Sequence, residues 1–258
     1  MSLLAAGLLA SSVSVGDTNI NLNDQCRMTL NHELRVSSEQ VTLIDNEQEV
    51  WRIDAQGALY IKGEYSEQPE HVQDMLVEYK QGVERQTDAV IYVVGEALHI
   101  THEALTSVFS EMFSENHRVV RRIDDLQETL SVEFDNIAQT VGNETIIRGQ
   151  ELDSFGDRLG DTIEHEVDEI VSSSMGSMLV MIGKELIKGG GDMQEFEQRM
   201  ERMGENLESR IEERTARIEE RADQMCDEMM ALNELEANLA TTIPAFANYP
   251  LFQNVDVN

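Results

Sequence analysis

The feature that most constrains the fold is a long stretch of sequence without proline. The chain has 258 residues but only three prolines, Pro69, Pro244 and Pro250. Proline removes a backbone donor and clashes with the preceding helical turn, so a proline-free stretch is open to helix formation. Between Pro69 and Pro244 apolar residues recur every three or four positions, which is the period of an amphipathic helix. The sequence therefore predicts a mainly α-helical protein.

Five helices are expected in this stretch, and local signals mark several of their ends. Pro69 suits the first turn of the first helix, and Thr87 or Asp88 suits the N-cap of the second. Gly142 is expected to end the third helix, and three glycines from Gly189 onward end the fourth. The apolar stripes of the five helices cover residues 72–83, 90–112, 119–141, 152–186 and 193–232.

The last of these helices is expected to be coiled-coil-like. Its first apolar positions, Met193, Phe196, Met200, Met203 and Leu207, are separated by 3, 4, 3 and 4 residues. About 45 residues of helix would be about 70 Å long. The periodicity predicts a partner helix, which would come from the same chain or from a second subunit.

The residues before Pro69 have the period of β-strands instead. Apolar and polar residues alternate over residues 26–36, which is typical of a strand with one buried face. Residues 41–44, 50–53 and 58–61 are further strand candidates, and residues 54–57 have the composition of a hairpin turn. The expected class is α+β, mainly α: a small N-terminal antiparallel β-meander followed by a bundle of long antiparallel helices.

These patterns divide the chain into four parts. Residues 1–15 are signal-peptide-like, residues 16–66 form the small β-sheet region, and residues 67–242 form the helical bundle. Residues 243–258 are an apolar C-terminal tail, which we expect to lie along the helices or to dock on a partner.

The N-terminal residues predict export. Residues 3–10 are an apolar run, and Ser12, Val13 and Ser14 after it resemble a signal-peptidase cleavage site. The basic region that opens a signal peptide is missing, because no Lys or Arg precedes Arg27; we expect the true start to lie upstream or to have been trimmed. The alternative is a buried N-terminal helix.

The charge of the chain argues against several classes of partner. It has 19 basic and 50 acidic residues, and the net charge is −31. Nucleic-acid binding needs a basic footprint, and the anionic cytoplasmic leaflet attracts basic rather than acidic surfaces. No run of 18 apolar residues occurs, so no transmembrane segment is expected either.

The only two cysteines, Cys26 and Cys226, are predicted to form a disulfide if the protein is exported. The bond would close a loop of about 200 residues, worth roughly 5 kcal/mol on the chain-entropy account. The alternative, for a protein that stays in the cytosol, is two free thiols. No C-x-x-C motif occurs, so neither a redox motif nor a zinc knuckle is expected.

One group of residues has the composition of a metal site: Glu96, His99, His102 and Glu103. Glu96 and His99 match half of a di-iron Glu-x-x-His motif, but no second copy of the motif occurs, and the zincin order H-E-x-x-H is also absent. We favour the alternative that these are polar residues at the border of a helix in an acidic protein.

Two further patterns are interpreted as structural. Met175, Met178 and Met181 form a stripe at three-residue spacing, which is more typical of core packing than of copper binding. His165 has acidic neighbours on its helix face, as is common in a chain with so many carboxylates. No catalytic motif or phosphate-binding loop occurs, so we predict no enzymatic activity and no cofactor.

The order of these features resembles a known family. An apolar leader is followed by Cys26 at the start of a strand and by the turn-rich hairpin of residues 53–63. A helix containing Met175 and Gly176 then leads to the glycine run at 189–190, and Cys226 lies near the end of the last helix. This resembles the YggN-like family of periplasmic proteins of unknown function (DUF2884). The resemblance implies a periplasmic location and supplies no catalytic residues.

We therefore expect an exported, non-enzymatic envelope protein that is structural or binds another protein, including a second copy of itself. The first alternative is a periplasmic metal-binding protein that uses Glu96, His99 and His102. The second is a hydrolase whose site the sequence does not reveal.

Overall fold

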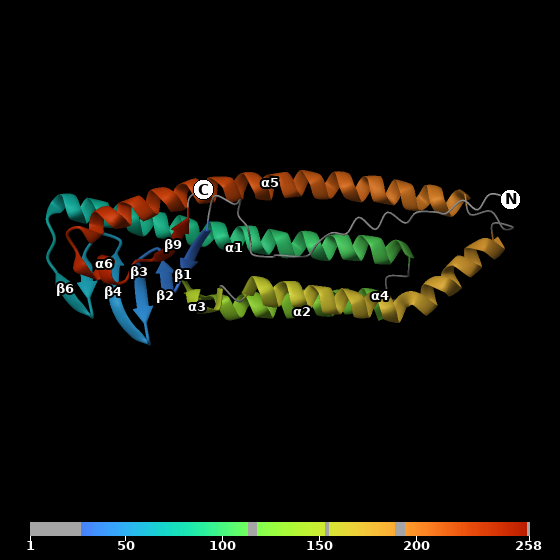
Figure 1. The fold of residues 1–258 in the computed structure, drawn as a ribbon, viewed down its shortest axis with the longest axis horizontal. Helices are drawn as coiled ribbons and strands as arrows, with labels where there is room; N and C mark the ends of the chain where they lie inside the picture. Colours follow the sequence, from blue (N-terminus) through green and yellow to red (C-terminus); the bar gives the residue numbers. More distant parts are fainter. Residues whose placement is uncertain (1–26, 113–117, 153–154, 189–193, 257–258) are drawn as a thin grey trace.

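The computed structural model describes residues 27–112, 118–152, 155–188 and 194–256, which form an elongated molecule with a β-sheet at one end (Figure 1). The helices are α1 (Glu70–Met112), α2 (Arg118–Ile137), α3 (Gly149–Leu152), α4 (Phe155–Lys188), α5 (Gln194–Ala240) and α6 (Pro244–Asn248). The strands are β1 (Arg27–Leu30), β2 (Glu33–Ser37), β3 (Gln40–Asp45), β4 (Gln48–Asp54), β5 (Leu59–Ile61), β6 (Glu64–Ser66), β7 (Ala138–Val141), β8 (Glu144–Arg148) and β9 (Phe252–Asp256). An N-terminal antiparallel sheet followed by helices confirms the predicted α+β, mainly α class.

The main sheet is antiparallel and has the strand order β6-β5-β4-β3-β2-β8-β7. Strands β2 to β6 are consecutive in the chain and form the predicted meander. The predicted turn at residues 54–57 is also confirmed. Asp54 Oδ1 accepts hydrogen bonds from the amides of Gln56 and Ala58, both at 2.9 Å, and Gly57 has a φ of 78°. Such a left-handed conformation favours glycine.

The prediction of one strand over residues 26–36 is wrong. The chain breaks at Asn31 and His32 into β1 and β2, and the carbonyl of His32 accepts a hydrogen bond from the amide of Gly149 at 3.1 Å. Strand β2 lies between β3 and β8, whereas β1 pairs with β9 in a separate two-stranded sheet. The alternation of side chains continues across the break, so it does not reveal that the two halves have different partners.

The predicted third helix is too long, because α2 ends at Ile137 and residues 138–148 form a β-hairpin. Strand β8 adds to the edge of the meander, with Leu34 opposite Ile147 and Val36 opposite Thr145. Ile147 is buried by this pairing. The free edge of β2 therefore decides the conformation of this segment, and local periodicity does not show such a tertiary pairing.

The first two predicted helices are one continuous helix, α1. Its start agrees with the prediction, since the carbonyl of Pro69 accepts hydrogen bonds from the amides of Val72 (2.9 Å) and Gln73 (3.0 Å). Thr87, which was expected to cap a second helix, is instead buried within α1. The apolar stripe continues across this position and packs against α5, so the helix has no reason to end there.

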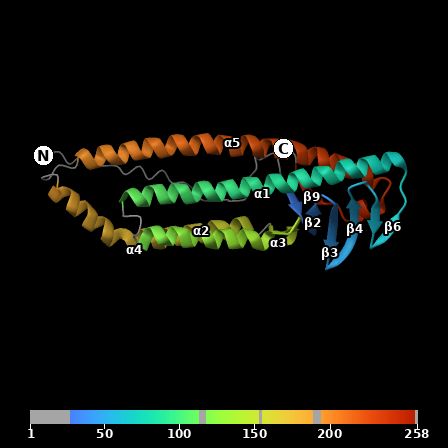
Figure 2. The same cartoon turned by 180° about the vertical axis from the view of Figure 1, so that it is seen from behind.

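Figures 1 and 2 show how the long helices are arranged. Helices α1 and α5 run antiparallel and pack together, while α2 packs against both α1 and α4. The C-terminal part of α4 and the N-terminal part of α5 extend past the end of α1, away from the sheet. Within the described ranges, no helix is both long enough and apolar enough to cross a lipid bilayer.

The core next to the sheet is built around Trp51 of β4. Its ring stacks on Phe246 of α6 at 5.1 Å between centroids and meets Tyr79 of α1 edge-on at 6.0 Å. Glu236 of α5 is buried beside them; one of its carboxylate oxygens accepts hydrogen bonds from the Tyr79 hydroxyl and the Leu251 amide, both at 2.7 Å. The C-terminal tail is therefore part of the core at this end of the molecule.

Candidate functional site

The four residues of the predicted metal site point in three directions. The carboxylates of Glu96 and Glu103 face Arg214 of α5, whose Nη1 lies 3.9 Å from Glu96 Oε1 and 2.8 Å from Glu103 Oε2. His102 faces α2, with its Nε2 3.7 Å from Asp124 Oδ1, and His99 is exposed to solvent. A guanidinium group already neutralises the two glutamates, so the geometry does not favour a cation there.

The described part of the chain contains no alternative metal site. Among these residues no group of three or more His, Cys, Asp or Glu side chains is placed to hold a metal ion. A shallow groove of about 440 Å³ between α1 and α5 is lined by Tyr92, Arg217, Glu220, Arg221 and Gln224. Arg217 lies 3.7 Å from Glu213, which makes its charge part of an ordinary helix-surface pair.

The structure describes only one of the two predicted disulfide partners. Cys226 is buried on α5. Cys26 directly precedes β1 and lies outside the described residues. The disulfide between them therefore stays a prediction.

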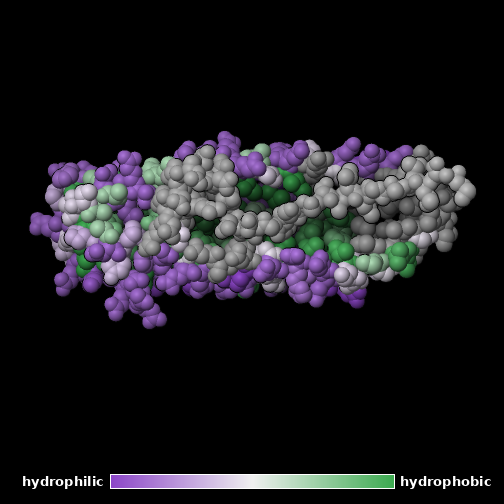
Figure 3. Space-filling model, viewed as in Figure 1, coloured by the Kyte–Doolittle hydropathy of each residue, from purple (hydrophilic) through white to green (hydrophobic). Residues whose placement is uncertain are grey.

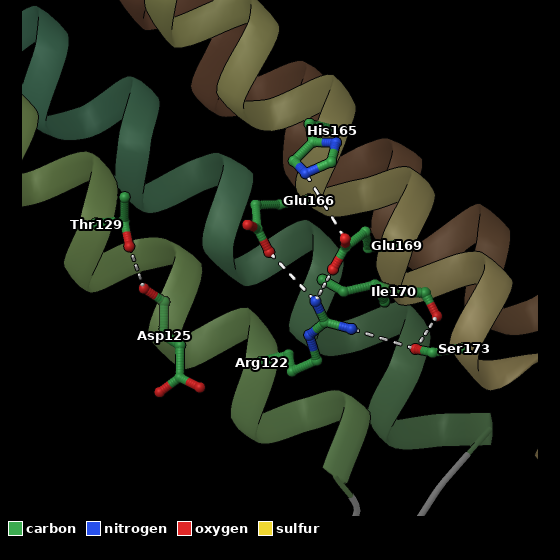
Figure 4. Close-up of polar contacts among 8 residues, drawn as sticks. All are labelled: Arg122, Asp125, Thr129, His165, Glu166, Glu169, Ile170 and Ser173. Carbon is green, nitrogen blue, oxygen red and sulfur yellow. Dashed lines mark hydrogen bonds and ion pairs between the residues drawn. The ribbon is translucent and has the colours of Figure 1, made fainter.

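A polar cluster joins α2 to α4 (Figure 4). Arg122 of α2 forms ion pairs with Glu169 and, at 3.6 Å, with Glu166, and its Nη1 donates to Ser173 Oγ at 3.4 Å. His165 Nε2 lies 3.6 Å from Glu169 Oε1. The hydrogen bond and charge of Arg122, with a smaller effect of His165, lower the pKa of Glu169. Glu169 and His165 are exposed and Arg122 is partly exposed, so the cluster positions α4 on α2 rather than forming an enclosed site.

Immediately after Glu169, α4 enters a segment without charged side chains. Residues 170–183 contain no Asp, Glu, Lys or Arg, although 27% of the chain is charged. We call these fourteen residues the uncharged segment of α4. Its inner face is anchored by Ile170, which is fully buried and packs with Phe109 of α1 and with Val119 and Ile123 of α2.

The outer face of the uncharged segment is apolar and open to solvent. The exposed fractions are 41% for Val171, 57% for Met175, 68% for Leu179 and 58% for Val180. These are four of the eight large hydrophobic side chains that are exposed in the described part of the molecule. In Figure 3 a small group of hydrophobic residues is visible at the C-terminal part of α4, at the lower right, and hydrophilic residues cover most of the same lower edge.

The spacing of the methionine stripe of α4 predicts that it packs in the core. At Met175 that expectation is wrong, because the side chain is more than half exposed; the side chains of Met178 and Met181 lie outside the described residues. The distinguishing signal in the sequence is the absence of charge over residues 170–183, not the spacing of the methionines. An exposed apolar patch with polar surroundings is typical of an interaction site.

Comparisons with known proteins place nearly the whole chain within one family. A family model described as a protein of unknown function (DUF2884) matches residues 26–252. No curated protein and no solved structure matches the chain.

Proposed function

Because the chain belongs to the DUF2884 family, whose description assigns no activity, we propose a function from its surface: it is an exported, non-enzymatic structural or interaction module of the bacterial envelope. One observation carries this proposal. The uncharged segment of α4 exposes Val171, Met175, Leu179 and Val180 together at the end of an otherwise acidic molecule.

Two features of the sequence support a periplasmic location. The apolar run at residues 3–10 is followed by small residues, as in a secretory signal. A chain with only two cysteines, of which Cys226 is buried on a long helix, fits a protein stabilised by one disulfide in an oxidising compartment.

The arrangement of the long helices supports a structural role. In our proposal α1, α2, α4 and α5 act as a helical bundle, with α5 packed on α1 in a coiled-coil-like manner. Helix α5 has 47 residues and α1 has 43, so at 1.5 Å per residue both exceed about 60 Å in length. Helix α4 packs on α2, which in turn packs on α1, and the apolar end of α4 lies far from the sheet, as at the end of a spacer.

Site-specific photo-cross-linking in intact cells tests this function. A photoreactive amino acid replaces Leu179 in one variant and Val132, an exposed residue of α2, in a matched control. We expect envelope adducts, of protein or of lipid, from position 179 and few from position 132. The proposal fails if position 179 gives no adduct, or if the protein is recovered entirely from the cytoplasm.

A further inference from the structure

The uncharged segment of α4 lies near one end of the molecule, where a large flat partner can contact it. The C-terminal part of α4 extends past the end of α1 in both views, at the end of the molecule opposite the main sheet (Figures 1 and 2). Met175, Leu179 and Val180, in the C-terminal half of this helix, are exposed. A Cβ added at Gly176 or Gly183 would meet no other atom within 4 Å, so the described neighbours leave this surface open.

The described part of this patch is small for a protein–protein interface. The four exposed side chains that the structure describes here offer a few hundred Å² of apolar surface. A stable protein–protein interface, including one with a second copy of this chain, buries about 800 Å² on each partner. A lipid interface needs no complementary shape, and binding to it scales with the apolar area that enters it.

The length and charge of the segment fit a bilayer surface. Fourteen helical residues span about 21 Å, less than the roughly 30 Å of a hydrocarbon core, so the segment is too short to cross but long enough to lie in the interface. No carboxylate occurs between Glu169 and Glu185, and two of the four lysines of the chain, Lys184 and Lys188, follow in the sequence. The rest of the molecule carries the acidic residues that an anionic surface would repel.

We propose that the uncharged segment of α4 inserts its outer face, with Met175, Leu179 and Val180, into the interface of a phospholipid bilayer. This inference rests on the proposed envelope function and names the partner of the same surface. The net charge of −31 disfavours attraction to anionic lipids for the whole chain. The apolar face therefore supplies the attraction, and a zwitterionic bilayer is the natural surface for it.

Flotation with phosphatidylcholine vesicles at physiological salt tests the proposal. The full chain is compared with Val180→Asp and with Val132→Asp, an identical change at a valine of nearly equal exposure, 53% against 58%. We expect the unaltered protein and Val132→Asp to float with the vesicles. Val180→Asp should partition at least about tenfold less, because a carboxylate in the bilayer is costly. Circular dichroism checks that both variants fold.

Three outcomes would overturn the lipid proposal. The first is unaltered protein that stays unbound at high lipid concentration. The second is equal loss of binding in Val180→Asp and Val132→Asp. The third is a dimer in light scattering that Val180→Asp dissociates while vesicle binding is absent, which would assign the face to a second copy. If the first outcome is accompanied by protein adducts from position 179, the envelope function is retained and only the lipid partner is rejected.

Discussion

At the scale of single residues, the buried carboxylate of Glu236 links three parts of the chain. It lies on α5 and accepts hydrogen bonds from the Tyr79 hydroxyl of α1 and from the Leu251 amide of the tail. Burial raises the pKa of Glu236, and the hydrogen bonds from Leu251, Tyr79 and Phe252 only partly oppose this shift. Burial and the adjacent carboxylate likewise raise the pKa of Tyr79 well above 10.0. A buried network of this kind is stabilising only while all its members are paired.

Tyr79→Phe tests the hydroxyl of this network. The change removes one donor from a buried carboxylate, so the free energy of unfolding should fall by about 1.5–3 kcal/mol. Urea denaturation at neutral pH measures the change. Tyr92→Phe on the same helix is the control, because Tyr92 is exposed and loss of its hydroxyl should change stability by no more than about 0.5 kcal/mol. Equal effects of the two changes would contradict the proposed network.

The raised pKa of Glu236 also predicts a pH dependence. Unfolded, this carboxyl titrates near its ordinary value of 4.5, whereas in the folded protein it titrates at a higher pH. Between these two values the folded state holds more protons than the unfolded state, so this group makes the free energy of unfolding decrease as the pH rises. The contribution reaches at most about 1.4 kcal/mol per pH unit.

Glu236→Gln removes this titration. Urea denaturation of both proteins at a series of pH values above 4.5 should show that the unaltered protein loses stability relative to the variant as the pH rises. Comparing the two proteins cancels the contributions of other carboxylates, including Glu169, whose pKa is lowered. Parallel pH profiles would show that Glu236 has no raised pKa.

At the scale of elements, one glycine, Gly149 where β8 ends and α3 begins, allows the backbone to approach residues 30–32 closely, where β1 ends and β2 begins. A Cβ on Gly149 would clash with the Leu30 carbonyl oxygen and would lie 2.6 Å from that of His32. Both obstacles are backbone atoms, which cannot rotate away as a side chain would. This close approach lets the β7–β8 hairpin reach the edge of β2.

Gly149→Ala should therefore destabilise the protein by about 1–3 kcal/mol through overpacking. Gly95→Ala on α1 is the matched control, because its new methyl group meets open space. In a helix interior that control change is expected to raise stability by up to about 1 kcal/mol. Thermal or urea denaturation measures both changes in stability. A Gly149→Ala variant as stable as the unaltered protein would mean that the backbone contact is not tight.

At the scale of the whole molecule, the predicted disulfide would tie the start of the sheet region to the last long helix. Without reductant, alkylation of the denatured mature protein should add no mass, and with reductant it should add two labels, one each for Cys26 and Cys226. Reduction should lower the free energy of unfolding by up to roughly 5 kcal/mol, since the bond closes a loop of about 200 residues. Two labels without reductant would reject the bond and weaken the case for export.

The sequence by itself determined the class of the fold and the position of most elements. The absence of proline between Pro69 and Pro244 and the 3.6-residue period predicted the long helices, and alternation predicted the meander. These signals succeed because each records which face of an element is buried, and that pattern is local in the chain. The same reasoning placed Met175 in the core, because an apolar stripe looks the same whether or not a partner covers it.

Only the tertiary structure decided which elements meet. It divided residues 27–37 between two sheets, made residues 138–148 a hairpin, and placed Phe246 against Trp51. It also separated His99 and His102 from Glu96 and Glu103 and left the outer face of α4 uncovered. Each outcome depends on contacts between residues far apart in the chain, and periodicity along one segment contains no information about the surface that segment will meet.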